Sequence, residues 1–170
     1  AGQYGAELAV KDINEAGGVL GGKMLKLVPM DGKGEAADSV SAFKKLVDEH
    51  HVVASIGTNF SSCNIPMASV ADEVKVPIIG TAASNELVTV DENGNLHPYS
   101  FRMCFIDSYL GTVIGNYAVD KLGVKNAALF TIAGNTNSES IGSFIRDAIN
   151  AKGANIVADE QCQEGDVDFR

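Results

Sequence analysis

Two loops rich in small polar residues could bind an anion. The first, IGTNFSSCN (residues 56–64), and the second, GTAASNEL (residues 80–87), each follow a short apolar run. Ser61 and Ser62 stand where a helix should begin, so their hydroxyls and the N–H groups of the first turn are free to face a carboxylate. A carboxylate held there would need no arginine. The alternative is that Ser61 or Ser62 only caps the helix.

A third segment, GGVLGGK (residues 17–23), has the glycine and lysine spacing of a phosphate-binding loop. Such a loop works because it follows a strand and opens a helix, so that backbone N–H groups converge on phosphate. Here the segment follows a helical pattern and precedes a strand-like one, and Met24 stands where a serine or threonine would hold magnesium. We therefore predict a helix end and a turn, and no nucleotide cofactor.

Residues able to perform catalysis form no recognisable site. The chain has no G-x-S-x-G and no H-E-x-x-H, and its cysteines lack an evident base. The cysteines also lack the spacing of metal ligands, which leaves buried or half-buried thiols, or one disulfide with one thiol left over: Cys63, Cys104 and Cys162. The sequence predicts a binding protein without a cofactor or metal, not an enzyme.

The elements that would position the two loops alternate along the chain. Helical periodicity covers residues 5–16, 36–47, 63–74, 110–117 and 141–149, and strand-like runs cover residues 24–30, 52–57, 76–80, 99–105, 126–133 and 154–160. Such alternation predicts an α/β fold with parallel sheets and helices on both faces, in which ligands bind beyond the carboxyl ends of the strands. A doubly wound sheet normally opens with a strand, whereas this chain opens with a helix. We expect a missing first strand, with an unusual fold as the alternative.

Size and charge exclude some classes of protein. A chain of 170 residues has room for one domain, or for one domain and part of another. The net charge is −9 and the longest basic run is Lys44–Lys45, which argues against a nucleic-acid partner. No apolar run approaches the 18 or so residues of a membrane span, so direct membrane insertion is not expected.

Three segments together resemble a known family. They are GAELAVKDINEAGGVLGGKMLKLVPMD (residues 5–31), VVASIGTNFSSCNIPMASVADEVKVPIIGTAASNEL (residues 52–87) and FRMCFIDSYLG (residues 101–111). They are similar, in order, to the periplasmic branched-chain amino-acid binding proteins, the substrate-binding subunits of ABC importers. The D-I-N-x-A-G-G segment followed by G-x-K is the most specific part.

The resemblance implies the type I periplasmic binding fold. This fold has two flavodoxin-like or Rossmann-like lobes, each a parallel sheet flanked by helices, joined by a hinge. We expect residues 1–103 to form an N-terminal lobe that lacks its first strand. Residues 104–170 would hold the hinge crossing and the first part of the second lobe, in a chain truncated at both ends.

The resemblance also implies ligand contacts. Ser61 matches the family serine whose hydroxyl and neighbouring N–H groups hold the ligand α-carboxylate, and Ala82 matches a residue that offers backbone groups. Ser84 takes the place of a hydroxyl residue that contacts the ammonium and carboxylate. Further predicted contacts come from the same loops: Asn59, Phe60, Ser62 and Ala83. The second-lobe segment GNTNSESIGSF (residues 134–144) departs from the family pattern, so side-chain specificity stays open.

By the same resemblance, the protein captures a free amino acid, branched-chain or related, and works with the membrane permease of an ABC transporter. Its location would be periplasmic or otherwise extracytoplasmic, with a signal peptide in the precursor and a lipid anchor left open. The alternative is a ligand-sensing domain of the same fold in a receptor or regulator. An enzyme of flavodoxin-like or hydrolase type is the third hypothesis.

Overall fold

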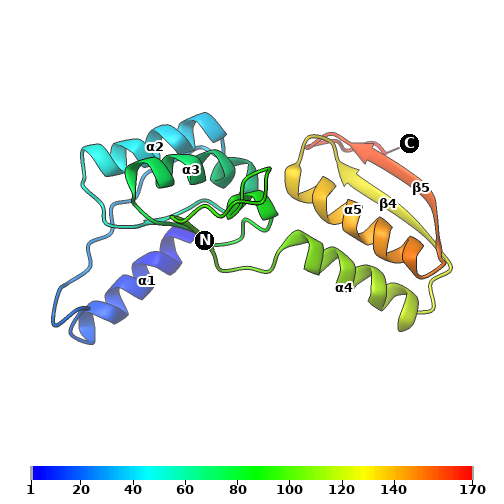
Figure 1. Cartoon of the computed structure of the whole chain (residues 1–170), viewed down its shortest axis with the longest axis horizontal. Helices are drawn as coiled ribbons and strands as arrows, with labels where there is room; N and C mark the ends of the chain where they lie inside the picture. The colour runs from blue at the N-terminus through cyan, green and yellow to red at the C-terminus, as the bar shows by residue number, and fades with distance from the viewer. Residues whose placement is uncertain (1, 170) are drawn as a thin grey trace.

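The computed structural model describes residues 2–169, whose elements fall into two groups (Figure 1). The first group holds α1 (Gly2–Glu15), α2 (Ala36–Asp48), β1 (Ser55–Ile56), α3 (Ser61–Val74), β2 (Ile78–Gly80), the 3-10 helix η1 (Glu86–Val88) and β3 (Ser100–Arg102). The second group holds α4 (Asp107–Asp120), β4 (Asn126–Ile132), α5 (Thr136–Ala151) and β5 (Asn155–Cys162).

Each group has its own parallel sheet. In the first, β2 lies between β1 and β3, and Ile78 pairs with Ser55 on one side and Ser100 on the other. In the second, β4 pairs with β5 from Asn126 opposite Asn155 to Ile132 opposite Cys162. Helix α3 packs against the first sheet and α5 against the second, while α2 and α4 pack on α3 and α5. The predicted α/β class with parallel sheets and flanking helices is confirmed.

The five predicted helices form, but the strand expected over residues 24–30 does not. Within the described residues no strand lies beside this segment to pair with its backbone groups. Instead, the side chain of Asn14 takes the place of a partner strand at Leu25: it accepts the Leu25 N–H at 2.7 Å and donates to the Leu25 carbonyl at 2.8 Å. The first-group strands are also shorter than expected, as β1 has only two residues.

The glycine-rich segment is a turn, as predicted. It follows the end of α1, and Val19 and Lys23 form an antiparallel bridge across it. Gly18 has a φ of 80°, and a Cβ there would lie 2.4 Å from the Lys23 carbonyl oxygen. Only glycine fits such a close approach at this backbone angle, so the glycines serve the turn.

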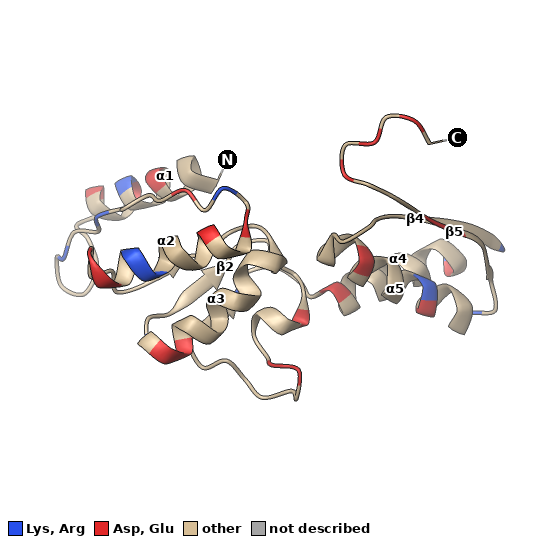
Figure 2. Cartoon of the chain, turned by 90° about the horizontal axis from the view of Figure 1, so that it is seen from above, with Lys and Arg blue, Asp and Glu red and all other residues tan. Residues whose placement is uncertain are grey.

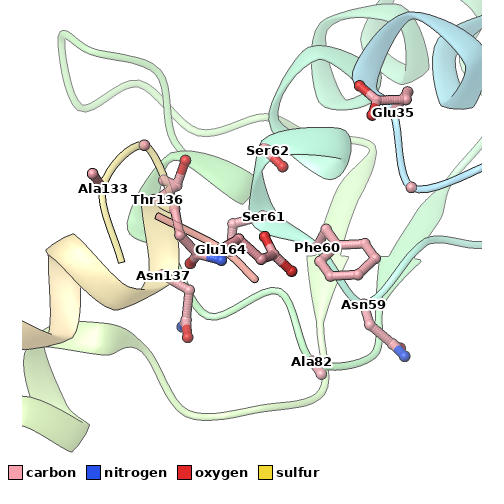
Figure 3. Close-up of a pocket in the computed structure, with 13 residues that line it drawn as sticks. Glu35, Asn59, Phe60, Ser61, Ser62, Ala82, Ala133, Thr136, Asn137 and Glu164 are labelled. Atoms are coloured by element: carbon pink, nitrogen blue, oxygen red, sulfur yellow. The ribbon is translucent and has the colours of Figure 1, made fainter. Parts of the chain in front are cut away.

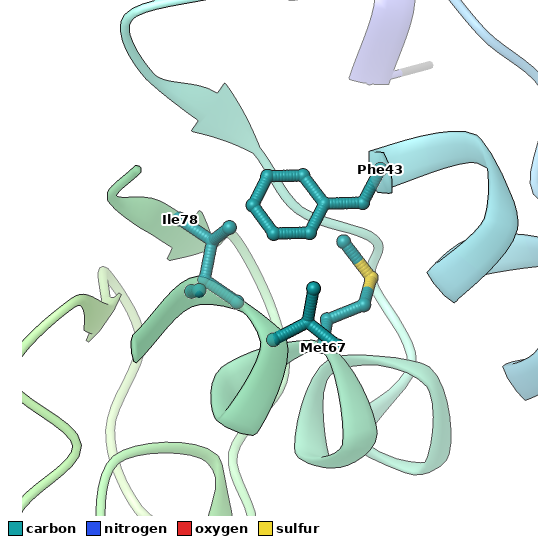
Figure 4. Packing of buried hydrophobic residues seen from close by; sticks show 5 residues of the cluster. Phe43, Met67 and Ile78 are labelled. Carbon is teal, nitrogen blue, oxygen red and sulfur yellow. The ribbon is translucent and has the colours of Figure 1, made fainter. Parts of the chain in front are cut away.

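Different side chains hold each group together. In the first, Phe43 of α2, Met67 of α3 and Ile78 of β2 meet in a core completed by Val70 and Ala71 (Figure 4). In the second, α4 and α5 approach closely at small residues. A Cβ at Gly115, for example, would lie 2.6 Å from the Cβ of Ala148. The first set of contacts holds α3 in place and the second holds α5, and both helices begin at the cleft described below.

The distribution of basic residues and the apolar character of the helices bear on possible nucleic-acid and membrane contacts. Lys and Arg are scattered over both groups in the view of Figure 2. None of the helices within residues 2–169 has the length and apolar character of a transmembrane segment.

Candidate functional site

A cleft of about 590 Å³ opens where the two groups face each other (Figure 3). Its first-group wall comes from the start of α3 and the loops around it. Its second-group wall comes from the loop between β4 and α5, the first turn of α5 and the segment after β5. The lining residues are Gly34, Glu35, Asn59, Phe60, Ser61, Ser62, Ala82, Ala133, Gly134, Asn135, Thr136, Asn137 and Glu164. This volume is in the range of small-molecule sites.

At the amino end of α3, backbone N–H groups that have no hydrogen-bond partner among the described residues lie at the cleft. Phe60 is the N-cap residue, and its side chain makes no capping bond. Within the described residues, no hydrogen bond is donated by the backbone N–H groups of Ser61 or Ser62. Neither serine caps the helix: the Ser61 hydroxyl instead accepts the Asn85 N–H at 3.3 Å. The first-turn N–H groups and the helix dipole can therefore stabilise an anion here.

A buried amide holds the loop before α3 in place. The Asn64 side chain is fully buried, and its Nδ2 donates to the carbonyls of Thr58 at 2.7 Å and Phe60 at 2.8 Å. A Cβ at Gly57 would lie 2.2 Å from Asn64 Oδ1, so the packing requires glycine there. Sequence reasoning missed Asn64. The signal was an amide on the buried face of an otherwise apolar helix.

Of the three predicted contact residues in the second loop, one lines the cleft and two lie buried beneath the lining. Ala82 lines the cleft, whereas Ala83 and Ser84 are buried and lie outside its lining. The Ser84 hydroxyl accepts a hydrogen bond from Asn137 Nδ2 of α5 at 2.7 Å. The structure thus brings five of the seven predicted residues to the cleft: Asn59, Phe60, Ser61, Ser62 and Ala82. Asn59 is oriented there by Thr81, whose hydroxyl donates to Asn59 Oδ1 at 2.7 Å.

Arg102, at the end of β3, fixes the backbone of that second loop. Its guanidinium donates to the carbonyls of Ser84 at 3.1 Å, Asn85 at 2.7 Å and Glu86 at 3.1 Å, and also to the Thr89 hydroxyl. Hydrogen bonds from a charged donor are the stronger kind, and the planar fork matches several acceptors at once. The sequence showed only a lone arginine inside a strand-like run, which gave no sign of this role.

The charges and thiols near the cleft bear on what it can hold. The charged lining side chains are the carboxylates Glu35 and Glu164. Anion recognition by the lining therefore rests on N–H groups and hydroxyls, with no cationic side chain among the described lining residues. Within residues 2–169, no three His, Cys, Asp or Glu side chains are grouped to hold a metal ion. The three cysteines are free thiols, which agrees with the first of the two interpretations of their spacing.

Relatives of known name share most of this sequence. An amino acid binding protein from Pseudomonas aeruginosa is 33% identical over 165 residues, which is 97% of this chain and 42% of that protein. The Leu/Ile/Val-binding protein homolog 3 of Brucella melitensis is 28% identical over 97% of this chain and 43% of its own length. The chain thus spans less than half the length of these relatives.

Solved structures match the fold. The branched-chain amino acid transporter substrate binding protein LivJ from Streptococcus pneumoniae, in complex with isoleucine, superposes with a TM-score of 0.87 at 33% identity, covering 99% of this chain and 46% of that one. A solute binding protein from R. palustris in complex with benzoate superposes with a TM-score of 0.78 at 25% identity, covering 93% and 42%. The type I periplasmic binding fold implied by the sequence is therefore confirmed.

The family described as periplasmic binding protein matches residues 1–170 in full. With two parallel-sheet groups, a cleft between them and relatives that are substrate-binding proteins, the chain belongs to the periplasmic binding protein family.

Proposed function

We propose that this chain is part of an extracytoplasmic substrate-binding protein that captures a free amino acid, branched-chain or related, for an ABC importer. The observation that carries the proposal is the start of α3, where the N–H groups of Ser61 and Ser62 face a cleft walled by both groups of elements. Residues 1–103 and 104–170 would belong to the two lobes that close on the ligand.

The ligand carboxylate binds at the start of α3 in this proposal. Two or more N–H groups and a helix dipole can hold it with no formal positive charge to desolvate. Isoleucine and benzoate, the ligands named for two similar structures, share a carboxylate and differ in the rest. A carboxylate subsite on α3 is consistent with both ligands.

The amino group of the ligand would face the acceptors of the cleft. Glu35 and Glu164 give the lining a negative charge, which favours an ammonium over a second carboxylate. We therefore propose that the protein binds a zwitterionic amino acid more tightly than a simple organic acid such as benzoate. The permease of the importer and the periplasmic location follow from this function and are part of the same proposal.

Isothermal titration calorimetry on the full-length protein tests the function. L-Isoleucine, L-leucine and L-valine form the test panel, and benzoate is the comparison ligand. We expect binding to at least one amino acid and weaker binding, or none, to benzoate. Absence of heat with every amino acid would refute the proposal, and tighter binding of benzoate would change the ligand class.

Ser61→Ala is the matching variant. It should weaken amino-acid binding by about 1.5–3 kcal/mol, the usual contribution of a hydrogen bond to a charged group. Ser41→Ala is the control, because Ser41 is an exposed serine on α2 whose hydroxyl bonds only the Ala37 carbonyl. Equal affinities of the two variants would remove Ser61 from the site.

A further inference from the structure

One side chain of the second group reaches the predicted ligand loop. Asn137, on the first turn of α5, donates from Nδ2 to Ser84 Oγ at 2.7 Å and to Asp107 Oδ1 at 3.1 Å. Among the hydrogen bonds of α5 within residues 2–169, the bond to Ser84 is the one that crosses to the first group. Two other bonds between the groups come from the first turn of α4, at the crossing itself: Asp107 N–H to the Ser84 carbonyl, and Ser108 N–H to Glu86 Oε1.

The Asp107 carboxylate depends on this amide. Asp107 is fully buried, and its Oδ2 has no hydrogen-bond partner among the described residues. No lysine, arginine or histidine in the described part of the chain pairs with it, so Asn137 is its side-chain donor. The Oδ1 atom of Asp107 accepts this hydrogen bond, so the amide turns its nitrogen toward Asp107. In a buried setting such a bond is stronger than in water, and its loss would leave a second buried oxygen of Asp107 without a side-chain donor from residues 2–169.

The same amide sets the direction of the Ser84 hydroxyl. Ser84 Oγ accepts from Asn137, and the structure shows no acceptor for its own proton among the described residues. A hydroxyl that accepts on one side remains free to donate on another. Ser84 is buried and does not line the cleft, but its hydroxyl lies 2.7 Å from Asn137, which does, so its uncommitted proton is directly behind the cleft wall.

We propose that Asn137 is a positioning residue that latches α5 to the first lobe and presents the Ser84 hydroxyl proton to the ligand. The second half rests on the proposed function, because it requires a ligand that accepts this proton. The latch half does not: it concerns only how the lobes sit without ligand. Closure about a hinge is a two-state change, and a bond that exists in one state shifts the population toward it.

Small-angle X-ray scattering of the ligand-free, full-length protein tests the latch. Asn137→Asp keeps the shape of the side chain but turns the donor into a carboxylate that faces Asp107. Both Asn137→Asp and Asn137→Ala should give a larger radius of gyration than wild type, because the lobes open. The control is Asn150→Ala, an exposed asparagine near the other end of α5, which should match wild type. Identical radii for all four proteins would overturn the latch.

A double-mutant cycle tests the positioning role, with L-isoleucine as the calorimetric probe. Asn137→Ala should raise the Kd about tenfold, as loss of one oriented hydrogen bond does. The effect should largely vanish in a Ser84→Ala background, since the amide then has no hydroxyl to orient. Additive effects of the two substitutions would overturn the positioning role. A wild-type protein that binds no amino acid would end the proposed function and the positioning role, while the scattering comparison still decides the latch.

Discussion

At the residue scale, the loop that carries Ala82 and Ser84 depends on Arg102. Arg102→Met removes donors to three carbonyls and one hydroxyl that are otherwise partly buried. We expect the free energy of unfolding to fall by about 2–4 kcal/mol, because hydrogen bonds from a charged donor contribute about 1.5–3 kcal/mol each and the loop can relax in part. Urea unfolding followed by circular dichroism measures this change.

Arg146→Met is the matched control for Arg102. Arg146 pairs with Asp159 on the surface, where both side chains are more than a third exposed. Such an ion pair contributes about 0–1 kcal/mol. If both arginine variants lost equal stability, Arg102 would be an ordinary surface arginine and the loop would be held by other contacts.

A pH effect belongs to Asp91, in the turn that precedes β3. The pKa of Asp91 is lowered from 3.8, first by the hydrogen bond from the Asn95 side chain and then by the Asn95 N–H, while desolvation opposes the shift and Asn93 adds a smaller effect. The pKa of Asp91 is lower in the folded protein than in the unfolded chain, so the ionised carboxylate stabilises the folded turn at every pH above the unfolded pKa. This stabilisation is lost as the pH falls through the lower pKa of the folded protein. A carboxyl-carbon NMR titration should place the Asp91 midpoint below 3.8, and Asn95→Ala should move it upward. A midpoint at or above 3.8 in wild type would contradict the hydrogen-bond assignment.

At the element scale, the contact between α4 and α5 depends on glycine. A Cβ at Gly115 would lie 2.6 Å from the Ala148 Cβ and 3.0 Å from the Ile145 carbonyl oxygen, and neither atom can turn away by a side-chain rotation. Overpacking typically costs about 1–3 kcal/mol, whereas alanine gains about 1 kcal/mol over glycine in helix propensity. We expect Gly115→Ala to lower the free energy of unfolding by up to about 2 kcal/mol in a denaturant titration.

Gly5→Ala is the control that measures the gain in helix propensity from glycine to alanine without any overpacking. Gly5 lies inside α1, and a Cβ there would meet nothing within 4 Å. This variant should raise the free energy of unfolding by about 0.5–1 kcal/mol. Stabilisation by both substitutions would mean that α4 and α5 can separate without loss, contrary to their close packing.

The helices could be predicted from the sequence more accurately than the strands. Amphipathic periodicity is a local property, so all five expected helices formed. The bounds of α2 and α3 agree with the expected ones to within two residues, whereas α5 begins at Thr136 and not at residue 141. The strand expected over residues 24–30 had the right apolar pattern, but a strand also needs a neighbour, and local patterns do not supply one. The same limit applies to the site: Ser61 could be placed because a helix start is local, while its contact with Asn85 could not. Arg102 and Asn137 act across the fold, and no spacing in the sequence connects them to Ser84.

At the scale of the whole molecule, the 170-residue chain exposes much apolar surface. On α4 and β4 alone, five large apolar side chains are at least 46% exposed: Tyr109, Val113, Ile114, Tyr117 and Phe130. Both sheets also end in strands with unpaired backbone groups, at β1 and β3 in one and at β4 and β5 in the other. Exposed apolar patches and open strand edges favour association.

The chain produced by itself should therefore self-associate and bind L-isoleucine more weakly than the full-length protein, whose relatives are more than twice as long. Size-exclusion chromatography with light scattering would show a mass that rises with concentration for the short chain. Tyr117→Lys, which places a charge on the exposed face of α4, should lower that mass, whereas Tyr4→Lys on α1 should act only if α1 also takes part. A short chain that stays monomeric at all concentrations and binds isoleucine with full affinity would show that these two groups of elements alone form the complete ligand site.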